Sequence, residues 1–89
     1  MKKPFRHRAT HDFWKLYDEL PAKIAELAHA NFELLKSDPK HPSLHFKNIK
    51  NDIWSARIGM HFRAIALEDE EGFTWIWVGS HAEYDRLIK

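Results

Sequence analysis

The hydrophobic periodicity of this 89-residue chain changes once, at the segment SDPKHPS (residues 37–43). Before this segment, apolar residues recur every three or four positions, which is the spacing of one helix face. After it, from Leu44, they alternate at every second position, which is the spacing of a strand buried on one side. The two prolines and the Ser-Asp pair end the helical part and prevent another helix from following at once. The sequence therefore predicts helices first and a sheet second.

Two helices are expected before the segment, joined so closely that they form a helical hairpin. Thr10 can cap the first helix, which begins at His11, and Asp12 is favourable in its first turn. Pro21 then interrupts the pattern and suits the first position of a second helix, Pro21–Lys36. The apolar residues of each helix form a single stripe, so both helices can pack on one layer.

Strands are expected on both sides of this hairpin in the sequence. The first, Pro4–Arg8, is short, charged and opened by a proline, which is typical of a sheet edge. The others are Leu44–Ile49, Ile53–Ile58, Phe62–Glu68 and Phe73–Gly79. The predicted fold, for residues 1–89 as one domain, is therefore of the α+β class. Its N-terminal helical hairpin packs on one face of a mainly antiparallel, four- to five-stranded sheet.

The loop of the middle hairpin decides which side chains share a face. If residues 59–61 form a three-residue loop, Arg57 pairs with Arg63 and Trp54 pairs with Ala66. One face then carries only apolar residues, namely Trp54, Ala56, Ile58, Phe62, Ala64 and Ala66. A two-residue loop would mix the faces, so the pattern selects this register. The other face carries Ser55, Arg57, Arg63 and Ile65.

The same alternation can be carried into the last hairpin through a four-residue loop. It predicts Trp75 and Trp77 on the apolar face, and Ile76 and Val78 beside Arg63 on the other. The second face is then a partly apolar surface that holds two arginines, which suits a groove that binds a ligand.

Composition narrows the classes of function. The chain has no cysteine, which excludes a disulfide framework and thiolate metal sites and fits a reducing, cytoplasmic compartment. No stretch approaches the roughly 18 apolar residues of a membrane span, and no apolar run follows the basic N-terminus to form a signal peptide. The net charge of +1 permits a partner with phosphates but does not require one.

Three stretches carry a resemblance to a known family: HPSLHFK (41–47), WS-x-RIG-x-x-x-RAI (54–65) and H-x-x-YD (81–85). Together with the helical hairpin, they resemble the RelE/ParE superfamily, the toxins of bacterial type II toxin–antitoxin pairs. The likeness runs from about Phe13 to Leu87. It implies a toxin whose partner is a cognate antitoxin.

The resemblance implies two activities, and a shared fold does not choose between them. RelE-like members cleave messenger RNA on the ribosome without a metal, through attack of the ribose 2′-hydroxyl on the adjacent phosphate. ParE-like members inhibit DNA gyrase and are not enzymes, and the low net charge favours this branch somewhat. A third alternative is a harmless protein that only binds its antitoxin, in an apolar groove around Ile65, Ile76 and Val78. The arginine-bearing face favours the first alternative.

Phosphoryl transfer needs cations around the phosphate. The resemblance implies this role for Arg63, which aligns with the arginine that contacts the scissile phosphate in RelE-like members. Arg57 has the spacing found in several ribonucleases, and Lys47 matches a strand lysine of the family. Alternatively, all three are ordinary solvated strand side chains whose stems cover apolar neighbours. Two opposed arginines repel by roughly 0.2–1 kcal/mol, which is easier to understand if an anion lies between them.

A ribonuclease also needs an acid and a base. The motif H-x-x-YD places His81 and Tyr84 where family members carry an acid or a base-stacking group, although both could simply pack on the sheet. Some members carry a glutamate base before the second strand, but here that segment (43–45) has no carboxylate. The possible base is therefore His45 or, in the hairpin loop, His61. No histidine pair has the spacing of H-E-x-x-H, so neither a metal nor another cofactor is expected.

Overall fold

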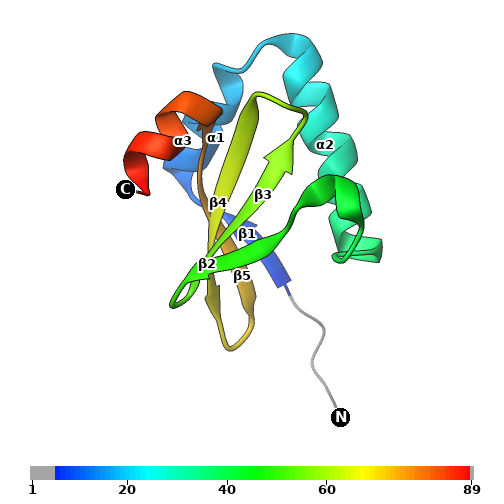
Figure 1. Ribbon diagram of the computed structural model, residues 1–89, viewed down its shortest axis with the longest axis vertical. Coiled ribbons are helices and arrows are strands. Elements are labelled where there is room, and N and C mark those ends of the chain that lie inside the picture. The colour runs from blue at the N-terminus through cyan, green and yellow to red at the C-terminus, as the bar shows by residue number, and fades with distance from the viewer. Residues whose placement is uncertain (1–5, 89) are drawn as a thin grey trace.

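A five-stranded sheet forms the centre of the structure, with the strand order β1-β5-β4-β3-β2. The computed structural model describes residues 6–88, arranged as in Figure 1. The elements are β1 (Arg6–Ala9), α1 (His11–Asp18), α2 (Ala22–Ser37), the 3₁₀ turn η1 (Pro42–Leu44), β2 (Lys47–Lys50), β3 (Ile53–Ile58), β4 (Phe62–Asp69), β5 (Gly72–Ser80) and α3 (His81–Leu87). β1 runs parallel to β5 and the other pairs are antiparallel. The predicted α+β class is confirmed.

The two helices of the hairpin pack on one face of the sheet, as predicted. α1 contacts β5 and α2 contacts β3, as can be followed in Figure 1. The Tyr17 hydroxyl of α1 donates a 2.9 Å hydrogen bond to the Ala25 carbonyl oxygen of α2. The predicted cap is confirmed, because Thr10 Oγ1 accepts a 3.1 Å hydrogen bond from the Phe13 N–H. Pro21 is the N-cap of α2 rather than its first residue, since its ψ of 145° is extended.

The hydrophobic core lies between these helices and the sheet. Its buried residues are Leu35, Leu44, Ala56, Ile58, Ala64, Ala66, Phe73, Trp75 and Val78. The register of β3 and β4 is the predicted one, with Arg57 opposite Arg63 and Trp54 opposite Ala66. The three-residue loop therefore separates an apolar face from a face that carries arginines.

The prediction for the last hairpin is wrong beyond Trp75. A β-bulge interrupts the pairing of β5 with β4: Trp75 and Trp77 pair with consecutive residues of β4, which leaves Ile76 as the extra residue. One extra residue reverses the face to which the following side chains point. Val78 is consequently in the core, with 1% of its surface exposed, and Trp77 lies on the face that carries the arginines.

The second strand begins later than the predicted range Leu44–Ile49. The turn η1 (Pro42–Leu44) comes first, and β2 starts only at Lys47. Leu44 is buried because it anchors this turn in the core, not because it alternates within a strand. His45 follows the turn in the left-handed conformation (φ 43°, ψ 42°), which is uncommon for a residue other than glycine.

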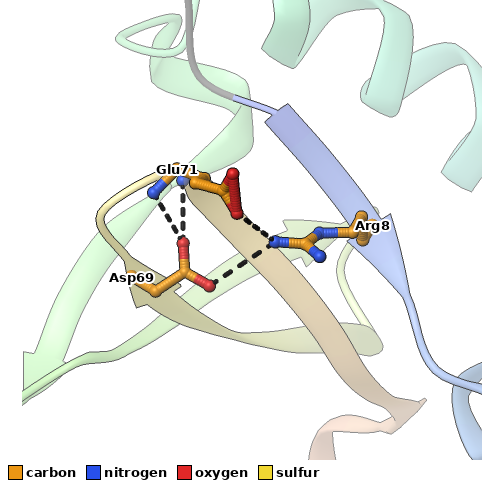
Figure 2. Close-up of polar contacts among 4 residues, drawn as sticks. Arg8, Asp69 and Glu71 are labelled. Atoms are coloured by element: carbon orange, nitrogen blue, oxygen red, sulfur yellow. Dashed lines mark hydrogen bonds and ion pairs between the residues drawn. The ribbon is translucent and has the colours of Figure 1, made fainter. Parts of the chain in front are cut away.

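β1 lies at a sheet edge, as predicted, although residues 4 and 5 of the predicted strand lie outside the described residues. Figure 2 shows the ion pairs at this edge: Arg8 Nη2 lies 3.2 Å from Glu71 Oε1 and 3.8 Å from Asp69 Oδ2. Exposed pairs of this kind contribute about 0–1 kcal/mol. They orient the edge strand on the β4–β5 turn, while burial of apolar side chains supplies most of the stability.

His7 of β1 is a titratable group placed against the core. Its ring stacks on Phe73 and Trp75 and meets Phe32 edge-on. Its Nδ1 accepts a 3.1 Å hydrogen bond from the Trp75 indole N–H. Burial, and then the charge of Lys36, lower the pKa of His7 from its ordinary value of 6.5. The fold therefore holds the neutral imidazole.

We expect the free energy of unfolding to decrease as the pH is lowered from about 7 to about 5. The unfolded chain, in which His7 has an ordinary pKa, binds a proton first, so protonation favours unfolding. The variant His7→Gln keeps an acceptor for Trp75 but does not titrate, and it should flatten this slope in urea unfolding curves. Replacement of the exposed His29 by alanine should leave the slope unchanged. An identical slope in His7→Gln would contradict the role given to this histidine.

Candidate functional site

The face of the sheet opposite α1 and α2 carries the charged residues singled out from the sequence. Paired residues share a face, so the register places Lys47 with Ser55, Arg57 with Arg63, and Arg63 with Gly79. We call this surface the arginine face. Its members include Lys47, Ser55, Arg57, Arg63, Ile65, Trp77 and Gly79. Ser55 is fully buried and Ile65 is 7% exposed, so the centre of this face is covered by surrounding side chains.

Arg57 and Arg63 lie side by side on this face without a carboxylate partner among residues 6–88. Arg57 Nε, Arg63 Nε and Arg63 Nη1 are buried nitrogens that have no hydrogen-bond acceptor there. A buried donor without an acceptor costs roughly 1–3 kcal/mol, more when charged, and opposed like charges add to this cost. An anion bound between the two guanidinium groups would remove both costs.

α3 covers one end of the arginine face because β5 passes directly into it. Ser80 Oγ accepts a 3.2 Å hydrogen bond from the Glu83 N–H, and Glu83 Oε1 accepts one of 3.2 Å from the Ser80 N–H. These bonds form a capping box, which lowers the pKa of the Glu83 carboxyl. Tyr84 of α3 is buried, and the Arg63 guanidinium lies 5.2 Å from the centre of its ring. This cation–π contact fixes the position of Arg63.

His81, the first residue of α3, is held at both its backbone and its ring. Its N–H donates a 2.7 Å hydrogen bond to the His61 carbonyl oxygen in the β3–β4 loop. Its Nδ1 lies 3.0 Å from Asp85 Oδ2. A carboxylate at this distance selects Nδ1 as the protonated nitrogen and leaves Nε2 available for chemistry.

His45 lies near the arginine pair from the side of β2. His45 is exposed, and its pKa is lowered, first by the charge of Arg57, then by local desolvation, and then by the charges of Arg63 and Lys47. The ring is therefore neutral near pH 7 and can accept a proton. Its backbone is left-handed directly after η1, and β2 begins two residues later.

The structure thus brings six of the candidate residues to one region: Lys47, Arg57 and Arg63 on the strands, Tyr84 and His81 on α3, and His45 before β2. His61 is exposed in the hairpin loop, and its described contact is through its backbone carbonyl group. The sequence placed Ser55 on this face but did not single it out as a site residue, and its buried Oγ has no hydrogen-bond partner among the described residues. Strand alternation predicts its position beside the arginines but not that its hydroxyl is buried without a partner.

Within the described part of the chain, His, Asp and Glu side chains form no group of three or more that could hold a metal ion. None of the helices between residues 6 and 88 is long and apolar enough to span a membrane.

Replacement of Arg57 by methionine should raise the stability of the isolated protein by about 1 kcal/mol at low ionic strength. The methionine keeps the apolar stem but removes an unpaired buried donor and a like-charge repulsion. Arg8→Met, which removes ion pairs instead, is the control and should not be stabilising. Urea unfolding measures both variants. If Arg57→Met is destabilised like an ordinary truncation, the arginine pair is satisfied by contacts within the protein.

Comparison with known proteins agrees with this fold. A sequence model of the ParE-like toxin domain matches residues 22–86. No curated protein sequence matches the chain at a significant level. Among solved structures, the RelE–RelB complex from Pyrococcus horikoshii is 14% identical with a TM-score of 0.71, covering 86% of this chain and 94% of that one. The RelB–RelE complex from Methanococcus jannaschii gives 14% and 0.73, with 92% and 99% covered.

The isolated RelE toxin of E. coli is 12% identical to this chain with a TM-score of 0.65, covering 96% of this chain and 99% of the other. Identities this low establish a shared fold, whereas the sequence model, which spans most of the chain, assigns the family. The chain belongs to the ParE-like toxin domain family.

Proposed function

We propose that this toxin is a metal-independent endoribonuclease that cuts messenger RNA on the ribosome. The observation that carries the proposal is the pair of opposed arginines, whose buried guanidinium nitrogens have no acceptor among the described residues. A phosphodiester supplies the acceptors that these donors lack, and two guanidinium groups can bind it through its two non-bridging oxygens. Lys47, on the same face, adds positive charge for the rest of the RNA backbone.

The side chains that would surround the bound phosphodiester define the proposed reaction. Neutral His45 accepts the proton of the ribose 2′-hydroxyl, and the 2′-oxygen attacks the adjacent phosphorus. Arg57 and Arg63 stabilise the negative charge that develops on the non-bridging oxygens. His81 acts in its imidazolium form: Asp85 holds the Nδ1–H, and the Nε2 proton is donated to the leaving 5′-oxygen. The products are a 2′,3′-cyclic phosphate and a 5′-hydroxyl, so the atoms balance without a metal or water.

An antitoxin is the proposed protein partner. The structures from Pyrococcus horikoshii and Methanococcus jannaschii are complexes of RelE with RelB, which supports a partner of this kind. The groove expected around Ile65, Ile76 and Val78 is not its docking site, because Val78 lies in the core. A cavity of about 230 Å³ between α1, α2 and the sheet fits an apolar segment better. Trp14, half exposed, stands at the rim of this cavity.

Induced expression in a bacterial host, with primer extension on an abundant transcript, tests the proposed activity. We expect early cuts within translated codons in the wild type and in Arg86→Ala, which removes an exposed arginine of α3. Arg63→Ala should lower cutting by at least about 100-fold, because it removes a charge-assisted contact made in the transition state. Growth arrest with intact transcripts would contradict a ribonuclease and indicate gyrase or another target. Normal growth would leave only antitoxin binding.

The pH dependence of single-turnover cleavage tests the base. The limb of the profile that rises with pH should have its midpoint below 6.5, because the pKa of His45 is lowered from this ordinary value. His45→Gln should lower the rate and remove the rise. His41→Gln, which changes a histidine on the other side of η1, should keep the wild-type profile. A rising limb that persists in His45→Gln would assign the base to another residue.

A further inference from the structure

Trp77 is set apart from the other tryptophans of this protein. Trp14, Trp54 and Trp75 each pack against another aromatic ring, and the indole N–H groups of Trp54 and Trp75 donate to Glu68 and His7. Within residues 6–88, the Trp77 ring has neither an aromatic neighbour nor a hydrogen-bond partner. The Trp77 side chain is partly buried. The indole of Trp77 therefore keeps an unbonded N–H donor and part of its surface accessible.

The bulge in β5 is the reason that Trp77 reaches the arginine face at all. If β5 paired regularly with β4, so that Ile76 had its own partner, Trp77 would point into the core and Val78 would lie on the arginine face. Bulges occur next to functional sites because they redirect a side chain. Here the redirected side chain of Trp77 lies opposite Ile65. The next pair on the same face, two residues further along each strand, is Arg63 with Gly79. Diagonal neighbours of this kind have Cα atoms about 7–8 Å apart.

Gly79 keeps the indole close to the arginines. A Cβ at this position would lie 2.5 Å from Trp77 Cζ2 and 2.9 Å from Cη2, so the ring extends along β5 over the glycine. Its six-membered ring therefore points toward the end of the strand at which Arg63 pairs with Gly79. An RNA whose phosphate lies between Arg57 and Arg63 would bring an adjacent base to this ring.

A cavity of about 140 Å³ opens beside Trp77, between the end of α1 and the start of α3. Its lining includes Phe62, Ser80 and two carboxylates, Glu19 and Glu83. The capping box keeps the Glu83 carboxylate ionised, because its hydrogen bonds to Ser80 lower its pKa. Two negative charges exclude a phosphate from this cavity but accept hydrogen bonds from amino groups. The cavity thus differs in charge from the arginine pair next to it.

We propose that Trp77 and this cavity form a nucleobase subsite, in which the base next to the scissile phosphate stacks on the indole. The subsite takes a base with an exocyclic amino group, which can donate to Glu83, in preference to uracil. This inference rests on the proposed ribonuclease activity and extends it to the choice of sequence. Stacking on an aromatic side chain tolerates any base, whereas a hydrogen bond to a carboxylate discriminates between bases.

The test uses ribosomes programmed with a defined messenger RNA whose vacant codon carries an abasic nucleotide at each position in turn. In the wild type, one abasic position should slow single-turnover cleavage by roughly 5- to 150-fold, the range expected for the loss of one stacked base. Uracil at that position should also slow it. Trp77→Leu should cut the intact codon more slowly by a similar factor and be indifferent to that abasic nucleotide. Trp77→Phe should retain most of the rate and the sensitivity.

Leu67→Ala is the matched control, because Leu67 is a 40% exposed residue of the same face and lies away from the arginines. It should behave like the wild type toward every abasic position. If Trp77→Leu keeps the full abasic penalty, the base stacks on another group. If no abasic position slows the wild type, no base contributes to binding. Either result would refute the subsite and leave the ribonuclease proposal standing. If the wild type cuts no programmed ribosome, the ribonuclease proposal fails and the subsite fails with it.

Discussion

The register between β3 and β4 is the constraint on which the rest of the site depends. The three-residue loop sets Arg57 directly opposite Arg63 and leaves the other face of the hairpin entirely apolar, with Trp54, Ala56, Ile58, Phe62, Ala64 and Ala66. Burial of that apolar face against the helices fixes the register, since a slip of one residue would bury the arginines. The hydrophobic core therefore stabilises an arrangement of like charges that would otherwise separate. The repulsion between the arginines lowers the stability of the fold, and burial of the apolar face of the same strands offsets this loss.

Two devices then complete the arginine face from its borders. The capping box at Ser80 starts α3 immediately after β5, so Tyr84 lies against Arg63 and His81 reaches Asp85. On the other border, η1 ends in the left-handed backbone of His45, whose pKa the arginines lower. Both histidines owe their positions to local backbone motifs, while the arginines owe theirs to long-range strand pairing. The proposed proton acceptor, His45, and the proposed proton donor, His81, thus lie on opposite borders of one cationic surface.

Much of this fold can be predicted from the sequence, because most of its elements follow simple periodic patterns. The change of period at residues 37–43, the Thr10 cap and the β3–β4 register are all confirmed. Prediction from periodicity fails at two places: where a bulge adds one residue to β5, and where the turn η1 replaces the start of a predicted strand. The bulge at Ile76 leaves the apolar pattern of β5 unbroken, since tryptophan, isoleucine and valine suit either face. Candidate site residues were found by motif, but their unpaired donors and the partly buried Trp77 depend on contacts between distant strands.

Anion binding by the arginine pair can be tested by NMR on the side-chain Nε–H groups. Titration with inorganic phosphate should shift the signals of Arg57 and Arg63 with a common saturation curve, because one anion bridges both. The exposed Arg86 should shift little, and Arg8, paired with Glu71 and Asp69, should serve as a second reference. Equal, non-saturating shifts of all four arginines, or no shift of the pair, would contradict the account.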